Sequence, residues 1–427
     1  MIYLIFIFIV LLFLGIPIAY AMGLTGFNYF IIADKEILMP IIANRIYEGV
    51  DKFVLMAIPF FMLAGEIMNK GDITRRLVGF CQYLVGRFRG GLGYVNVMGS
   101  FLFAGLTGTA IADVSALGSI FIPAMEKEGY GKGYSAAITA ASSIMGPIIP
   151  PSIIIVIYGG VTGTSIGALF AGALIPGVLV GLSNCVYNYY ISKKRNYPVN
   201  KAEFDFKTFI EYSRDAFLAI IAPLIIIGGI LAGIFTPTEA GAVAVAYSLF
   251  VGFFVFKKLK IRDLGDICTK AVLSSAMLFI IIGMANILGW IMGMEEIPEI
   301  IGKFMLSFSK DPRTIFLLIN LLLLFLGTWM DIGTALVLLA PMLAPLMLKM
   351  GVHPVHLGIV MIVNLNIGLC TPPLGVCLFA ACGIAKVSLE EITKEIFPFV
   401  LLEIVVLMII TYLPQTVLYI PRILGLI

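Results

Sequence analysis

Two carboxylates, Asp113 and Asp331, lie within apolar stretches that are long enough to enter a lipid bilayer. A charged side chain near the bilayer centre is costly, so such a residue normally pairs, faces a cavity or serves an ion. For Asp331 two roles are open: support of a site for a sodium ion, or a structural cap on the helix that follows. The same two roles are open for Asp113.

Neutral oxygen donors stand beside the points where glycine and proline interrupt the apolar stretches; they are Thr107, Thr109, Ser152, Thr328, Thr334, Asn364 and Thr371. Sodium is a hard cation that suits such oxygens together with backbone carbonyls. The alternative for each hydroxyl is a hydrogen bond to its own helix, which is common in membrane helices. The sequence has no Walker or H-E-x-x-H motif, so enzymatic chemistry is not predicted.

The stretch around Asp113, from Ser100 to Ser152, contains residues that an unbroken helix rejects. They are Gly105, Gly108, Gly146, Pro147, Pro150 and Pro151. Irregular backbone at membrane depth survives only where it is buried in protein or lines a polar cavity. The carbonyls that a break frees suit cations, and the N–H groups suit anions. The interruptions therefore predict a binding site for an ion and a charged solute.

The pattern recurs in the second half of the chain at one constant offset and without gaps. Gly105 falls on Gly327, Gly146 on Gly368, and Pro150-Pro151 on Pro372-Pro373. We interpret the recurrence as an internal duplication, which in membrane proteins is a pointer to the binding site of a secondary transporter.

The composition bounds the class of protein. Of the 427 residues 60% are hydrophobic and only 12% are charged, which predicts a polytopic membrane protein. The net charge of +3 resides in short loops and does not imply nucleic acid. The six cysteines include no C-x-x-C pair, so neither disulfides nor zinc are predicted.

The elements that must position these residues form an all-α fold of two repeats. We expect one helix over residues 1–31, and interfacial arms over 72–89 and 297–308, since apolar segments this short do not span a bilayer. The first predicted repeat, 1–195, contains a hairpin over 100–126 and a broken helix over 134–158. The second, 215–427, contains a hairpin over 315–348, a broken helix over 355–385 and a last helix over 389–413. A polar link, 196–214, joins the two repeats. Basic loops assigned to the cytoplasmic side make the second hairpin enter from the opposite face, so the repeats are predicted to be inverted.

Several strings, among them IPFFMLAGEIM, GTAIADVSALGSIFIPAM, GPIIPPSIIIVIYG, FTPTEAGAVAVAYSL and NLNIGLCTPPLGVCLF, resemble the large membrane subunit of tripartite ATP-independent periplasmic (TRAP) transporters. The resemblance covers essentially the whole chain. It implies an elevator-type, sodium-coupled importer of an organic acid, of the sialic acid or C4-dicarboxylate class, in the bacterial inner membrane. It also implies two partners, a small four-helix membrane subunit and a soluble periplasmic binding protein.

The resemblance assigns roles to single residues. Thr107, Thr109 and Ser152, with Pro150 and Pro151, are implied to contact the substrate carboxylate. The implied sodium sites take oxygens and carbonyls around Gly105, Gly327, Thr328, Asp331, Asn364, Gly368 and Thr371. Two alternatives remain open: a sodium/dicarboxylate symporter that works alone, and an ion channel or intramembrane scaffold.

Overall fold

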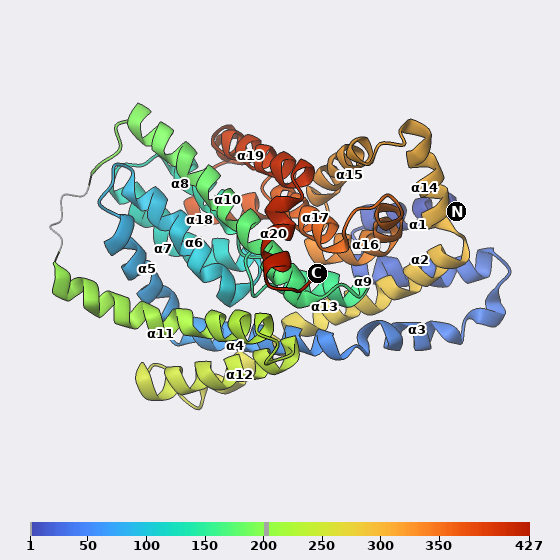
Figure 1. The fold of residues 1–427 in the computed structure, drawn as a ribbon, viewed down its shortest axis with the longest axis horizontal. Coiled ribbons are helices and arrows are strands. Elements are labelled where there is room, and N and C mark those ends of the chain that lie inside the picture. Colours follow the sequence, from blue (N-terminus) through green and yellow to red (C-terminus); the bar gives the residue numbers. More distant parts are fainter. Residues whose placement is uncertain (1, 200–204) are drawn as a thin grey trace.

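The structure, a computed structural model, describes residues 2–199 and 205–427, and within them every regular element is helical (Figure 1). In that part of the chain seven helices are long and apolar enough to cross a membrane. The prediction of an all-α polytopic membrane protein is therefore confirmed. The side chains of Gly105 to Thr107 at the first hairpin lie outside the description.

The helices of the first half follow the chain in this order: α1 Ile2–Phe13, α2 Ile18–Ile32, α3 Ile41–Val50, α4 Ala57–Lys70, α5 Ile73–Val85, α6 Gly91–Thr107, α7 Ala110–Lys127, α8 Lys132–Ser143, α9 Ile153–Thr162 and α10 Ile166–Lys194. The single helix expected over 1–31 is wrong. Two helices occupy this segment, because Gly15 takes a left-handed conformation (φ +77°) and Pro17 has no N–H to continue the first helix.

The second half contains α11 Phe206–Leu231, α12 Pro237–Phe250, α13 Asp263–Met294, α14 Ile297–Phe308, α15 Pro312–Gly327, α16 Ile332–Lys349, α17 Pro354–Gly368, α18 Val376–Ala385, α19 Leu389–Tyr412 and α20 Gln415–Ile423. The start of α12 shows why these helices begin where they do. Thr236 and Glu239 form a reciprocal capping box, and Pro237 occupies the first turn, where its missing N–H is not needed.

The helix boundaries repeat with the offset seen in the sequence. Helices α7 and α16 each contain 18 residues, and both their first and their last residues are separated by the offset that relates Gly105 to Gly327. The first residues of α8 and α17 are separated by the same offset. The interruptions that follow them, 144–152 and 369–375, contain the two double prolines.

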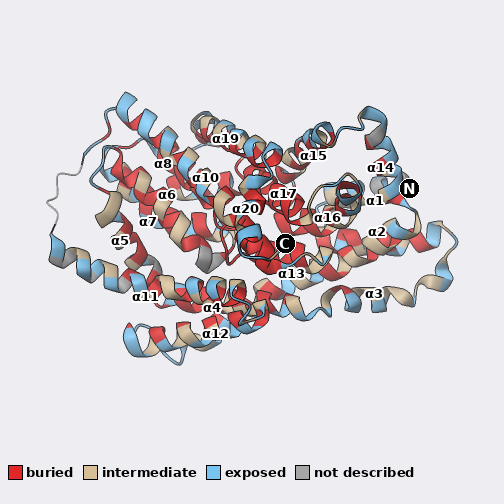
Figure 2. Cartoon of the chain, in the orientation of Figure 1, coloured by how far each residue is buried: buried red, intermediate tan, exposed pale blue. Residues whose placement is uncertain are grey.

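The two hairpins lie at opposite ends of the molecule (Figure 1). Helices α5, α6 and α7 gather at one end and α14, α15 and α16 at the other, with α10, α17 and α20 between them. The buried residues concentrate in the broken helices (Figure 2): α17 is buried from Val355 to Gly368 and α8 from Gly133 to Ser143. The first break, 144–152, lies in this core, where water cannot satisfy the backbone, whereas Pro373 and Leu374 of the second break are exposed.

The repeat-related helices α10 and α19 run in opposite directions. They pack against each other, and the ion pair of Arg195 at the end of α10 with Glu395 in the first turns of α19 measures 2.8 Å from Nη2 to Oε1. The end of one helix therefore meets the beginning of the other.

A lysine joins the segment before α4 to the end of α9. The Lys52 ammonium donates to the carbonyl oxygen of Gly160 at 2.9 Å, at the helix end where carbonyls lack partners within the helix. Burial lowers the pKa of Lys52 from its ordinary value, but the contact keeps a charged donor on the helix terminus.

We expect Lys52→Met, which keeps the apolar stem, to destabilise the protein by about 1 kcal/mol through loss of this hydrogen bond. Thermal unfolding in detergent measures the effect. Lys193→Met is the control, since the Lys193 side chain is exposed and makes no hydrogen bond or ion pair within the described chain. Equal melting temperatures for Lys52→Met and the wild type would contradict the role of the contact.

Candidate functional site

The first break is held by its own polar groups. The hydroxyl of Ser152, the cap of α9, accepts from the N–H of Ile155 at 3.3 Å and donates to the carbonyl of Pro147. All residues from Ile144 to Ser152, including Pro150 and Pro151, are buried. A carboxylate could accept from the Ser152 hydroxyl only by replacing the carbonyl of Pro147.

The tip of the first hairpin lies against the start of α9. Gly108 is left-handed (φ +62°), and a methyl group on it would come within 3.3 Å of Ile153. Thr109 follows in extended conformation at the cap of α7, without a hydrogen bond from its side chain to the helix. The structure therefore places Thr109 and Ser152 beside the same turn of α9, while the predicted contacts of Gly105 and Thr107 fall outside the described side chains.

Asp113 faces the first break from the first turn of α7. The residue is fully enclosed, and its Oδ2 lies 2.7 Å from where a Cβ on Gly146 would be. Only glycine at position 146 leaves room for this carboxylate. The geometry places Asp113 at the first break, and both of its predicted roles remain predictions.

The second hairpin touches the second break backbone to backbone. A Cβ on Gly368, the last residue of α17, would lie 2.5 Å from the carbonyl carbon of Gly327, the last residue of α15. A Cβ on Gly327 would lie 3.0 Å from the carbonyl oxygen of Leu365. The structure thus brings together two glycines that the family resemblance implies in the sodium sites.

Two predicted sodium ligands bond to their own helices. The Thr328 hydroxyl donates to the carbonyl of Phe325 at 2.7 Å, and the Thr371 hydroxyl donates to the carbonyl of Ile367 at 2.8 Å. This is the alternative role that the sequence left open. Each hydroxyl still has an oxygen lone pair for a cation.

Among the predicted oxygen donors, Oδ1 of Asn364 and Oγ1 of Thr334 are buried without a hydrogen-bond partner in the described part of the chain. Asn364 lies on α17 one turn before the break, and its amide nitrogen donates to both oxygens of Asn320. Thr334 lies in the first turn of α16. A hard cation that has lost its water shell needs buried oxygens that no hydrogen bond already occupies, and these two oxygens meet that need.

Asp331 caps α16. Its Oδ2 accepts from the N–H of Gly333 at 2.9 Å and of Thr334 at 3.4 Å. One carboxylate oxygen thus performs the structural role, and these bonds orient the side chain. A cap of this kind does not exclude a cation at the other oxygen, because an ionised carboxylate has about four acceptor positions.

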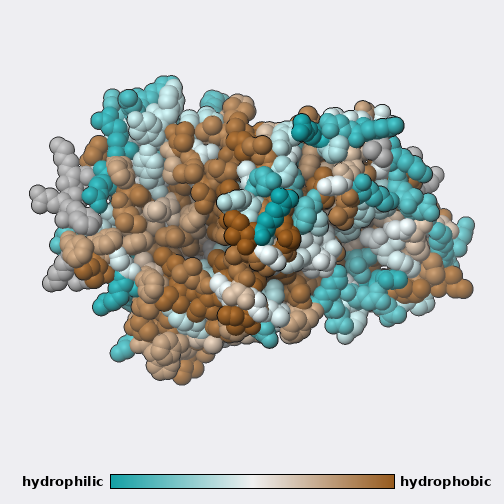
Figure 3. Space-filling model, viewed as in Figure 1, coloured by the Kyte–Doolittle hydropathy of each residue, from teal (hydrophilic) through white to brown (hydrophobic). Residues whose placement is uncertain are grey.

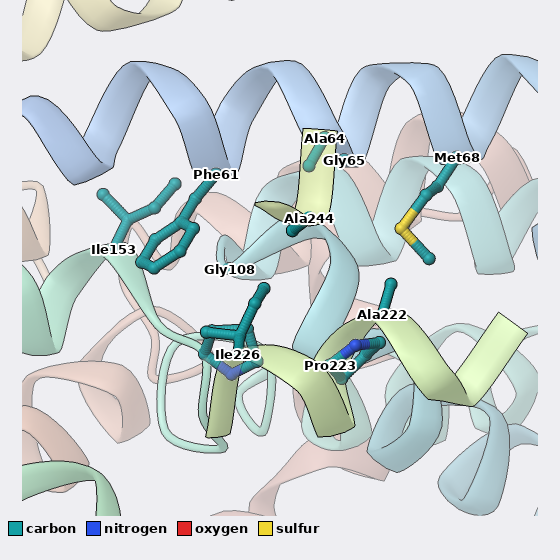
Figure 4. Close-up of a pocket in the computed structure, with 11 residues that line it drawn as sticks. Phe61, Ala64, Gly65, Met68, Gly108, Ile153, Ala222, Pro223, Ile226 and Ala244 are labelled. Carbon is teal, nitrogen blue, oxygen red and sulfur yellow. The ribbon is translucent and has the colours of Figure 1, made fainter. Parts of the chain in front are cut away.

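The tip of the first hairpin also packs against α4 and α11, which belong to neither the hairpins nor the broken helices (Figure 4). Gly108, Pro151 and Ile153 face Phe61 of α4 and Pro223 of α11 across a cavity of about 10 Å³. Such a volume holds about one water molecule. In this conformation an organic acid cannot reach the tip from the side of α4 and α11.

Sequence reasoning missed a pair of polar networks that hold the hairpins to the broken helices. In the first half Asn96 on α6 donates to Thr139 on α8 at 2.6 Å and accepts from Ser142 at 3.2 Å. In the second half Asn320 on α15 bonds to Asn364 and donates to Thr411 on α19 at 2.9 Å. Ser142 and Asn364 are equivalent positions of the two repeats, and that equivalence is the signal that could have revealed the networks.

Residues 5–416, nearly the whole chain, match the family described as "Tripartite ATP-independent periplasmic transporter, DctM component". The chain belongs to the DctM family. It is a multi-pass permease subunit of a TRAP transporter and not an enzyme.

Relatives within the DctM family carry different substrate names. The chain is 38% identical over 415 residues to the sialic acid TRAP transporter large permease SiaM of Vibrio cholerae, covering 96% of both proteins. It is 34% identical to the C4-dicarboxylate large permease DctM of Rhodobacter capsulatus, covering 98% of both. It is 42% identical to the isethionate permease DctMQ of Oleidesulfovibrio alaskensis, covering 95% of this chain and 64% of that protein.

A solved structure shares the fold at low sequence identity. The YdaH transporter of Alcanivorax borkumensis matches with a TM-score of 0.60 and 12% identity, covering 89% of this chain and 88% of that one. At this identity the likeness concerns the fold alone.

Proposed function

We propose that this DctM subunit imports an organic acid by coupling its movement to sodium, with an elevator motion of the hairpins and broken helices. The observation that supports this most is the close contact of Gly327 with Gly368, together with the buried, unpartnered oxygens of Asn364 on α17 and Thr334 on α16. Open backbone groups and free oxygens near a helix break form a suitable environment for a small hard cation.

The residues around the second break fit sodium. Oxygens are available from Asn364, Thr334 and Asp331, and Gly327 and Gly368 leave their backbone groups open to close approach. A bound sodium ion would supply positive charge beside the substrate site. This chain's part is to hold the oxygens in place, which the Asn320 network and the cap on α16 do.

The substrate class follows from chemistry that the named relatives share. Sialic acid, C4-dicarboxylates and isethionate are all anions that carry a carboxylate or a sulfonate. We infer that the same acidic group binds here at Thr109 and Ser152, beside the N-terminus of α9, whose positive end favours an anion. Which acid is carried depends on groups beyond this shared contact.

The antiparallel packing of α10 and α19 supports inverted repeats. Inversion places the two hairpins on opposite sides of the membrane and allows alternating access as the unit that holds the site moves. More than one sodium ion per monocarboxylate would add electrical drive, at about 2.3 kcal/mol per net charge and 100 mV.

We infer two partners, a small membrane subunit and a periplasmic binding protein. The family description names a tripartite system, and the match to DctMQ leaves about a third of that longer permease for another component. The many large apolar side chains exposed on this chain, Phe27 and Phe217 among them, face lipid or such a subunit (Figure 3).

The test is uptake of labelled sialic acid, a C4-dicarboxylate and isethionate into proteoliposomes. Vesicles contain this chain with or without its small subunit, with or without an inward sodium gradient, and with or without the binding protein. We expect uptake of one acid, and only when the small subunit, the sodium gradient and the binding protein are all present. Uptake by this chain alone would instead favour a stand-alone symporter, and uptake without a sodium gradient would contradict sodium coupling.

A further inference from the structure

A cavity of about 690 Å³ opens where α15 and α17 begin and α19 ends. Among the side chains that line it are Arg313 in the first turn of α15, His353 at the cap of α17, and Arg422 on α20. The volume falls in the range of about 300–1,000 Å³ that is usual for small-molecule sites. Among the described residues that line the cavity there is no aspartate or glutamate.

Neither arginine is neutralised by a carboxylate of the described chain. The guanidinium of Arg422 reaches only Gln415, at 3.5 Å, and that of Arg313 makes no hydrogen bond or ion pair within the described residues. The nearby carboxylate of Asp311 is used as the cap of α15, accepting from the Arg313 N–H and the Thr314 hydroxyl. Both arginines are exposed and line one cavity without a described carboxylate, so their guanidinium groups are available to an anion from outside the chain.

The first half shows the same place in a filled and neutral form. At the offset that relates the two repeats, Phe316, Val352 and His356 of the cavity fall on three tyrosines, Tyr94, Tyr130 and Tyr134. Tyr197 packs onto Tyr130 with ring centroids 4.3 Å apart.

The arginine in that first-half cluster has a partner. Arg195 lies over the Tyr134 ring and forms two hydrogen bonds with Glu395, at 2.8 and 3.0 Å. In the second half Phe316, Val352 and His356 line an open cavity together with two arginines, and no described aspartate or glutamate is among its lining residues.

The surroundings of the cavity indicate the source of the anion. Helix α20 exposes Tyr419 and Ile423, 55% and 65% accessible, beside Arg422, and Leu413 and Leu424 are also exposed at its ends. Large apolar side chains next to a basic residue on a short helix are typical of helices that lie in the membrane interface. In Figure 3 hydrophilic atoms over α20 border a hydrophobic band of the surface.

We propose that this cavity binds the phosphate headgroup of an anionic phospholipid, held between Arg313 and Arg422. The phosphate oxygens accept from both guanidinium groups, and the acyl chains leave along the apolar face of α20. Because α15 and α20 contribute one arginine each, the lipid ties the base of the second hairpin to the C-terminal helix.

The test measures thermal unfolding of the purified protein in neutral detergent, with dioctanoyl phosphatidylglycerol, dioctanoyl phosphatidylcholine or inorganic phosphate added. A ligand of the folded state raises the melting temperature in proportion to its affinity. We expect phosphatidylglycerol to raise it and the other two probes to leave it nearly unchanged. In the Arg313→Ala/Arg422→Ala variant the apparent affinity for phosphatidylglycerol should fall about tenfold or more, as for the loss of charge-assisted hydrogen bonds.

The matched control is Lys310→Ala/Lys349→Ala, which removes the same charge from exposed positions outside the lining and should keep the full response. If the double arginine variant does not fold, the two single variants replace it, each with a reduced response. An undiminished response in the arginine variants would overturn the site. Equal stabilisation by inorganic phosphate would overturn the lipid as its ligand, and equal stabilisation by phosphatidylcholine would overturn recognition of negative charge.

Discussion

Gly368→Ala is expected to abolish uptake and to destabilise the folded protein by about 3 kcal/mol or more. The added Cβ would lie 2.5 Å from the carbonyl carbon of Gly327 and 2.6 Å from its Cα. Both are backbone atoms at a helix end in the core, so no side chain can rotate away to relieve the clash. To make room for the methyl group, the second hairpin must move away from the second break, and this movement pulls apart the oxygens proposed to bind sodium.

The measurement pairs thermal unfolding in detergent with uptake in proteoliposomes. Gly383→Ala is the control, because Gly383 lies on α18 of the same broken helix and nothing is within 4 Å of the added methyl group. That change should leave uptake unaffected and stability unchanged or slightly higher, since alanine favours helix over glycine by up to about 1 kcal/mol. Wild-type stability and uptake in Gly368→Ala would show that the two backbones are not in contact.

The breaks could be predicted because glycine and proline disrupt helices locally, whatever surrounds them. Pro150-Pro151 and Pro372-Pro373 fall between helices as their chemistry requires, and the duplication placed the second pair once the first was known. The division of the N-terminal segment into α1 and α2 was missed for a related reason. Uniform apolar character hid Gly15 and Pro17, whose effect on the backbone is as local as that of the double prolines.

The partner of each site oxygen could not be predicted. The hydroxyls of Thr328 and Thr371 turn back to their own helices, while Asn364 finds Asn320 on a helix 44 residues earlier. Whether a side chain bonds to its own helix or to another one depends on its rotamer and on the neighbouring helix. Neither can be predicted from the spacing of residues in the sequence. The cavity between Arg313 and Arg422 was invisible for the same reason, since the two arginines are brought together only by the fold.

Asp331→Asn is expected to raise the sodium concentration needed for half-maximal uptake by about tenfold or more without lowering the melting temperature. Asparagine caps helices as well as aspartate does, so the bonds to the N–H groups of Gly333 and Thr334 are retained. Only the negative charge is removed, and a loss of about 1.4 kcal/mol in cation binding corresponds to a tenfold change in affinity. The substitution therefore separates the two roles that the sequence left open.

Asp331→Ala removes the cap as well and should cost about 1 kcal/mol of stability in addition to the change in sodium dependence. Asp311→Asn supplies the control, because Asp311 caps α15 in the same way at the surface end of the hairpin and should alter neither property. For each variant, uptake measured over a range of sodium concentrations gives the sodium dependence, and thermal unfolding gives the stability. If Asp331→Asn transports with the sodium dependence of the wild type while Asp331→Ala is less stable, the carboxylate is a cap only, and the cation must be held by the Asn364 and Thr334 oxygens and the backbone at Gly327 and Gly368.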